Sequence, residues 1–169
     1  MAVSKSFIRK ANIDNTLKAI LRGLIDRVAP ALLTLVVSTV LTEAAHAYGK
    51  LVLGGAGTLR SHTLPAATGS GATFSFVVGA VNTSSYVVKV ANATDVMDGQ
   101  IAQLTDGAQA VIAFGTGATS DTITLNGTTM GGVSIGDWFE LTDIAPGQWT
   151  VRGQVTASGT AATPFSATV

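Results

Sequence analysis

The sequence predicts a mainly β protein, with an antiparallel β-sandwich or barrel-like body that follows an N-terminal α-helical and extended arm. Of the 19 glycines, all but Gly23 lie at or beyond Gly49, where short apolar runs alternate with turn residues. Turn signals at roughly eight- to twelve-residue intervals are typical of sandwiches and barrels. Residues 1–28 follow a helical period instead, and no alternation of strands with long helices indicates a parallel α/β sheet.

Charge divides the chain at the same place. Residues 1–27 hold six Lys and Arg against two Asp, a net charge of +4, and the remaining residues hold four against eight, a net of −4. Only 12% of all residues are charged and 47% are hydrophobic, and surfaces so poor in charge are usually covered by a partner or by further copies. We therefore expect an attachment and oligomerisation arm over residues 1–47 and a β-rich body over 48–169.

The arm begins with an amphipathic helix. Asn12 or Asp14 can cap its start, and Pro30 ends it. Lys18 and Arg22 lie on its polar face. Seven apolar residues share one helical stripe: Ile13, Leu17, Ile20, Leu21, Leu24, Ile25 and Val28. The stripe indicates either a helix packed on its own domain or one that docks on copies or a partner. A membrane-surface helix is disfavoured because no Trp marks the interface and the cations form no dense face.

After Pro30 the chain contains apolar, β-branched runs bounded by Gly, Pro and Asn. Residues rich in Val, Ile, Thr and aromatic side chains favour strands. The predicted strands here are Leu32–Thr42, Lys50–Leu53, Thr58–Leu64, Thr73–Val78, Tyr86–Ala91 and Val111–Phe114.

The second half adds predicted strands at 121–125, 138–141 and 148–156. Asn126-Gly127 is a strong hairpin signal, and Pro146-Gly147 suits a type II turn. In the last strand Trp149, Val151 and Val155 are expected on one face, with an irregularity near Gly153. Trp138 and Trp149 flank the Pro-Gly turn and are expected to be core neighbours across the hairpin, with a carbohydrate-binding shelf as the less favoured reading. Residues 158–169 form a tail rich in Gly, Ala, Ser and Thr.

No pattern of residues indicates catalysis. The chain lacks Cys, and His46 and His62 are not spaced as a helical zinc pair. No strand-turn-helix elbow of the form Gly-x-Ser-x-Gly supports a catalytic serine, and no glycine-rich segment continues into Lys-Ser/Thr and a helix. Asp95 and Asp98 lack the ligand spacing of a calcium loop and favour Asx turns instead. We therefore predict no enzyme activity, cofactor or metal, and the missing aromatic platform disfavours nucleic acid.

An N-terminal leader is the main alternative interpretation of residues 1–47. Basic residues precede an apolar run over residues 29–41, and Ala45-His46-Ala47 resembles a small-x-small cleavage site. The preceding stretch is longer than a usual n-region, and Thr34, Ser38 and Thr39 dilute the run. The run is also too short to span a bilayer. An exported surface protein is therefore a less favoured expectation.

Several segments of the body resemble a module of tailed-bacteriophage virion proteins, the head decoration or cement (head-fibre-like) family. The resemblance is carried by residues 63–78, 88–99, 121–127, 136–144, 149–153 and 159–166. It implies a β-rich homotrimer on the outer capsid surface of the virion, with the major capsid protein as partner and no catalytic residues. Residues 1–47 depart from the shared part.

The resemblance and the patterning together predict a non-enzymatic protein that binds and stabilises a phage capsid, with no membrane or nucleic-acid partner. A head- or tail-fibre adhesin that binds a host receptor or glycan is the first alternative. The interface is expected on the helical stripe and the following apolar run, at Ile13, Leu17, Ile20, Leu21, Arg22, Leu24, Ile25, Arg27, Val28, Leu35 and Val37. The cations are expected to meet an acidic capsid surface.

Overall fold

A computed structural model of the chain describes residues 16–18, 32–107 and 110–169. The chain divides into two units, Met1–Pro30 and Ala31–Val169, and each is treated by itself. In the first unit the described residues 16–18 are helical, as predicted, and the side chain of Leu17 is 62% exposed. The rest of the predicted helical stripe lies outside the described residues.

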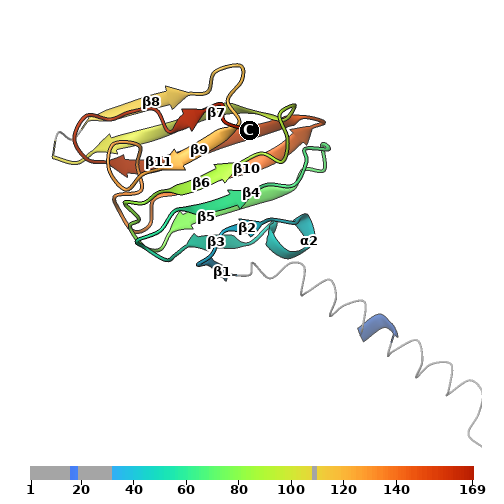
Figure 1. Ribbon diagram of the computed structural model, residues 1–169. Helices are drawn as coiled ribbons and strands as arrows, with labels where there is room; N and C mark the ends of the chain where they lie inside the picture. The colour runs from blue at the N-terminus through green and yellow to red at the C-terminus, as the bar shows by residue number, and fades with distance from the viewer. Residues whose placement is uncertain (1–15, 19–31, 108–109) are drawn as a thin grey trace, which may run out of the picture. The chain divides into compact units, whose positions relative to one another are not determined.

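The second unit consists of two β-sheets that pack face to face (Figure 1). The seven-stranded sheet has the order β1 (Leu32–Leu35), β3 (Lys50–Leu53), β5 (Thr73–Val78), β10 (Trp138–Ala145), β11 (Gln148–Ala157), β7 (Val96–Thr105), β8 (Val111–Gly115). The five-stranded sheet has the order β12 (Phe165–Ser166), β9 (Thr122–Leu125), β6 (Tyr86–Lys89), β4 (Arg60–Thr63), β2 (Thr39–Val40). A single helical turn, α2 (Glu43–His46), connects β2 to β3.

The first six strands wind as a flattened coil. They alternate between the two sheets, and each pairs in parallel with the strand two places earlier, so that β1, β3 and β5 follow one another in one sheet and β2, β4 and β6 in the other. A chain that crosses to the opposite sheet and returns runs in its original direction, which makes its new strand parallel to the previous one.

The mainly β, two-sheet body is confirmed, but the sheets are mixed. Five of the ten strand pairs are parallel and five are antiparallel. The expectation of a wholly antiparallel body is therefore wrong in this detail. Side-chain alternation identifies a strand and its buried face, but it is the same for both directions of pairing.

The predicted Pro-Gly turn is confirmed and the predicted irregularity is displaced. Gly147 has a φ of +76°, as the third residue of a type II turn requires, and it joins β10 to β11. The register shift lies between Asp143 and Ala145, whereas Gly153 stays in register opposite Phe139. A Cβ at position 153 would lie 2.5 Å from Phe139 Cβ, so this glycine permits close packing rather than a bulge.

Asn126-Gly127 does not form the predicted hairpin. β9 pairs with β6 and β12, while the next strand, β10, belongs to the other sheet. The Asn126 Oδ1 atom accepts the N–H groups of Thr128 and Met130, at 3.0 and 2.8 Å. The dipeptide therefore begins a loop between the sheets, because local turn chemistry does not determine which strand comes next.

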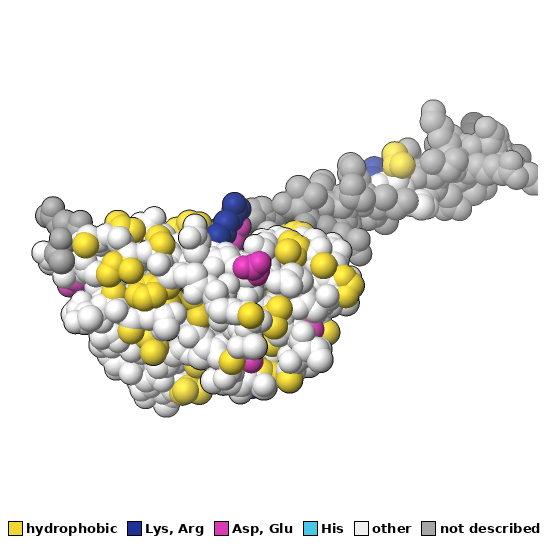
Figure 2. Space-filling view, turned by 90° about the horizontal axis from the view of Figure 1, so that it is seen from above, with side chains coloured by type: hydrophobic (Ala, Val, Ile, Leu, Met, Phe, Trp, Pro, Cys, Tyr) yellow, Lys and Arg dark blue, Asp and Glu magenta, His cyan; other side chains and the backbone are white. Residues whose placement is uncertain are grey.

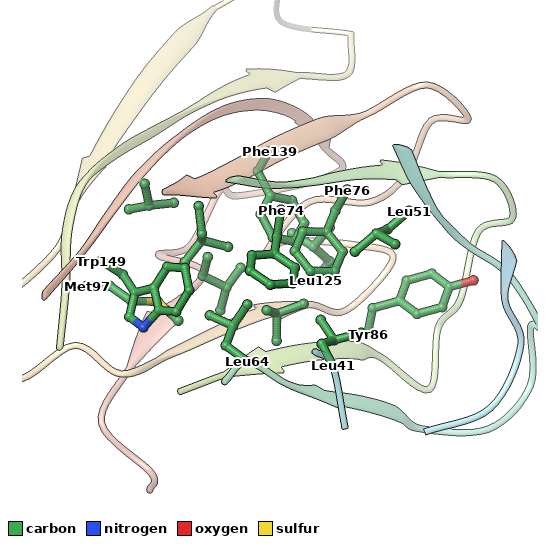
Figure 3. Close-up of a cluster of buried hydrophobic side chains, with 14 of the residues drawn as sticks. Leu41, Leu51, Leu64, Phe74, Phe76, Tyr86, Met97, Leu125, Phe139 and Trp149 are labelled. Carbon is green, nitrogen blue, oxygen red and sulfur yellow. The ribbon is translucent and has the colours of Figure 1, made fainter. Parts of the chain in front are cut away.

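The core lies between the sheets and is rich in aromatic rings (Figure 3). Phe74 meets Trp149 edge-to-face at 5.7 Å, and Phe76 stacks on Phe139 at 4.9 Å. Trp149 is fully buried but pairs with Asp143, whereas Trp138 pairs with Gln154 and is 39% exposed. The two tryptophans are therefore not cross-strand neighbours.

Trp149, Val151 and Val155 are all buried on the inner face of β11, as their spacing predicts. The predicted strand Leu32–Thr42 is divided into β1 and β2 by a bend at residues 36–38. This bend carries the chain from one sheet to the other.

Candidate attachment surface

The first turn of the coil leaves one side of both sheets open. β1 is the end strand of the seven-stranded sheet and β2 the end strand of the five-stranded sheet. We call residues 32–40, which comprise β1, the bend and β2, the β1–β2 edge. Within the described part of the chain, β1 pairs only with β3 and β2 only with β4. Backbone groups on the outer side of an end strand are ready to pair with another chain.

The β1–β2 edge exposes apolar side chains. The exposed fractions are 73% for Leu32, 50% for Val36, 61% for Val37 and 72% for Val40. Natural proteins usually protect end strands with charges, proline or a covering segment. Exposed apolar side chains on an end strand therefore indicate a surface that another segment covers.

Arg60 lies behind the bend of this edge. A Cβ at Gly55 would lie 3.2 Å from Arg60 Nε and 3.2 Å from the Val36 carbonyl oxygen, which places the three residues together. Arg60 Nε is buried and finds no hydrogen-bond partner among the described residues. The ion pair found in this part of the chain joins Arg152 to Glu140, so the positive charge of Arg60 is not balanced by a carboxylate there.

Charge is distributed unevenly over the body. Residues 32–64 hold Lys50 and Arg60 against Glu43, a net of +1, while residues 65–169 hold two cations against seven carboxylates, a net of −5. Figure 2 shows one face of the molecule, on which uncharged side chains predominate. The β1–β2 edge thus lies in a part of the body whose net charge is positive, like that of residues 1–27.

The buried carboxylates of the acidic part hold loops in place. Asp143 is fully buried and accepts the N–H groups of Thr68, Gly69 and Ser70 at 2.9, 2.7 and 3.1 Å. The hydroxyl groups of Thr68 and Ser70 donate to it as well. Burial alone would raise the pKa of Asp143, but these hydrogen bonds outweigh burial and lower the pKa below 3.8. The charge is fully engaged in fixing the loop at 68–70.

Asp121 and Asp137 act in the same way elsewhere. Asp121 accepts the N–H groups of Thr168 and Val169, which ties down the end of the chain. Asp137 accepts the N–H groups of Gly132, Ser134 and Thr156, which ties the loop before β10 to β11. These aspartates stabilise the fold and are occupied by backbone donors.

His62 is buried between the sheets without a hydrogen bond. Its side chain is fully buried in β4, and neither ring nitrogen finds a partner among the described residues. The pKa of His62 falls from 6.5 to about 4, because burial disfavours the imidazolium and the nearby positive charge of Arg60 repels it. The ring is therefore neutral in the folded protein near neutral pH.

This burial predicts an acid-dependent loss of stability. The unfolded chain binds a proton at His62 near pH 6.5 but the folded protein only near pH 4, so stability falls as the pH falls through this window. The pKa difference corresponds to a loss of about 3 kcal/mol of unfolding free energy at pH 4. Chemical denaturation from pH 7 to pH 4 measures it, and His62→Leu should remove most of the slope. His46→Leu, in the only partly buried α2, should retain the slope; if His62→Leu retains it too, His62 is not its source.

Of the predicted interface residues, the structure buries one, exposes two and does not describe the others. Leu35 is 4% exposed and belongs to the core, so its side chain is used within the body, whereas Val37 is exposed at the bend. Leu17 is exposed in its own unit. The remaining predicted residues lie outside the described part of the chain: Ile13, Ile20, Leu21, Arg22, Leu24, Ile25, Arg27 and Val28.

Sequence reasoning placed the interface on the apolar run that contains Leu32, Val36 and Val40, although it named only Leu35 and Val37 of that run. It missed Arg60. The apolar run itself predicted a strand, but its exposure follows from β1 and β2 being end strands, which local sequence does not encode. Arg60 carried no motif; its unbalanced charge became visible only when the bend was placed beside it.

The described residues contain no group of three or more His, Asp or Glu side chains that could hold a metal ion. Asn92 Oδ1 accepts the N–H groups of Thr94 and Asp95 in an Asx turn, whereas the Asp95 carboxylate accepts the N–H group of Ala67. Across residues 16–18, 32–107 and 110–169, no helix combines the length and apolar character needed to cross a bilayer.

Comparisons of the chain with protein-family models, with curated proteins and with solved structures found no match.

Proposed function

We propose that the chain is a non-enzymatic structural protein that binds the outer surface of a tailed-phage capsid and stabilises it. Its basic N-terminal arm and the β1–β2 edge form the attachment region, and the charge-poor body covers the capsid. The major capsid protein is the partner, and a homotrimer is the assembly state that the family resemblance implies.

The open β1–β2 edge carries this proposal. It is apolar, and it begins directly after the arm in the sequence. A protein that bridges capsid subunits needs apolar area at its attachment end and gains strength from many copies bound at once. Cations near this end complement an acidic capsid surface.

The test uses capsids of the phage that encodes the chain, assembled without it. Full-length protein should bind these capsids at regular seams between subunits and raise the temperature at which they rupture. Deletion of residues 1–27 should abolish binding while the body keeps its circular dichroism spectrum. If the protein that lacks residues 1–27 still occupies all of its capsid sites, the attachment region lies in the body. If the full-length chain does not bind the capsids, the proposal is rejected.

A receptor-binding fibre adhesin is the second candidate, and the exposure of Trp138 favours it. This indole is 39% exposed and lies beside Val77 in the strand register, which gives a small apolar platform of the kind that sugar rings stack on. Binding of the protein to host cells, and its loss in Trp138→Ala, would support this candidate over capsid attachment.

A further inference from the structure

We propose that the β1–β2 edge accepts an extended, carboxylate-bearing strand of the partner protein, which adds to the seven-stranded sheet beside β1. One carboxylate of that strand pairs with Arg60 beyond the end of β1. The inference rests on the proposed attachment function and specifies its chemistry, namely main-chain pairing together with one ion pair.

The strand register shows which backbone groups are free. In a parallel pair, alternate residues turn both their N–H and C=O groups toward the neighbouring strand. Leu35 is paired with Leu53, and its C=O accepts the N–H of Gly54 at 3.0 Å, so Leu33 and Leu35 face β3. Leu32 and Thr34 therefore direct their backbone groups away from β3, where no described strand pairs with them.

The exposed side chains suit an added strand. Leu32 and Leu33 lie on opposite faces of β1 and are 73% and 38% exposed. A strand beside β1 would place its own alternate side chains against both of them. Main-chain hydrogen bonds would supply the affinity for the added strand. The side-chain contacts would determine which sequences bind, as in other cases of strand addition.

Charge favours a carboxylate-bearing partner. The buried Nε atom of Arg60 has no hydrogen-bond acceptor among the described residues, and Arg60 lies close to the Val36 carbonyl. Lys50 lies next to Leu32 in the register. A carboxylate brought to the guanidinium of Arg60 forms a charge-assisted hydrogen bond that balances its positive charge. A second copy of the same edge would instead bring the same cations toward each other, which is unfavourable.

The opposite end of this sheet is less suited to such a partner. β8 is also an end strand and exposes Val111 and Ile112. It belongs to the part of the body with a net charge of −5, which repels a carboxylate-bearing strand. The β1–β2 edge therefore combines the open backbone with the right sign of charge.

The first test changes one backbone donor. Thr34→Pro removes an outward N–H without touching the β1–β3 ladder, and proline is tolerated in end strands. Thr34→Val keeps the N–H and a similar shape and is the matched control. The probe is a soluble ten-residue peptide alternating Glu with Val and Thr, titrated against the full chain. We expect Thr34→Pro to weaken its binding about tenfold or more and Thr34→Val to leave it nearly unchanged.

Hydrogen exchange locates the strand. Binding of the peptide should slow exchange of the Thr34 amide in the full-length protein, and both variants should melt close to the parent temperature. Arg60→Met should weaken binding of the Glu-containing peptide but not binding of a matched peptide in which Lys replaces Glu. Equal binding of the peptide to the Pro and Val variants, or no protection of Thr34, would overturn the proposal. A multimer that Thr34→Pro dissociates without peptide would assign the edge to a second copy instead.

Capsid binding separates this inference from the proposed function. Loss of capsid binding in Thr34→Pro but not in Thr34→Val supports both. Full capsid binding by Thr34→Pro leaves the attachment function standing and rejects the added strand. Peptide addition without any capsid binding by the parent chain supports the strand site and rejects capsid attachment.

Discussion

Gly99→Ala should unfold the body or cost about 4 kcal/mol or more of unfolding free energy. Gly99 has a φ of +143°, and a Cβ there would lie 1.9 Å from the carbonyl oxygen of Val151 on the paired strand. Backbone atoms cannot move aside as a flexible side chain can, so the parallel β7–β11 pairing must separate. Chemical denaturation followed by tryptophan fluorescence measures the loss, because Trp149 lies in β11.

Gly115→Ala is the matched control for this prediction. Gly115 lies on the neighbouring strand β8, has no positive φ, and its added Cβ would find its nearest contact at 3.9 Å. We expect a change within about 1 kcal/mol. If Gly99→Ala is as stable as Gly115→Ala, the close approach of β7 and β11 at this position is wrong.

Asp143→Asn should destabilise the body by about 3 kcal/mol at neutral pH. The substitution replaces one accepting carboxylate oxygen with a donating NH₂ group, which then faces the backbone donors of the loop at 68–70. At least one of these N–H groups loses its acceptor in a fully buried site. The measurement is the free energy of unfolding from urea titration at pH 7.

The pH dependence provides a second readout for Asp143. Its pKa is lowered on folding, so its stabilising contribution is present above the unfolded pKa and is lost as the pH falls through the folded value. The difference between parent and Asp143→Asn should therefore shrink below about pH 4. Asp98→Asn, at an exposed position of β7, should leave stability nearly unchanged. A loss at Asp98 equal to that at Asp143 would show that lost charge, rather than the loop contacts, is responsible.

The coiled path of the first six strands explains why no described strand pairs with the outer sides of β1 and β2. In such a coil each new strand pairs in parallel with the strand of the previous turn. The strands of the first turn have no previous turn, so one side of each lacks a partner strand from the coil. Repeat proteins with such ends require a capping segment. In this protein the first turn also exposes several apolar side chains, which links the topology to the proposed attachment.

The sequence by itself determined most of the segments that form strands, but β7 (Val96–Thr105) and β12 (Phe165–Ser166) were not predicted. Alternation at Thr73–Val78 and over residues 148–156 reflects one buried face, and that pattern is local, so β5 and β11 were predicted closely. The type II turn at Pro146-Gly147 was predictable for the same reason, because its dihedral angles depend on these two residues.

Only the tertiary structure decided how the strands pair and which apolar residues stay exposed. Asn126-Gly127 has ideal hairpin chemistry, yet β9 and β10 lie in different sheets, because pairing depends on the fit of distant segments. Leu35 and Leu32 look alike in sequence, but the neighbouring sheet covers the first and leaves the second open. Burial and partner choice are properties of long-range contacts, and for that reason the open backbone of the β1–β2 edge and the unbalanced charge of Arg60 became visible only in the folded chain.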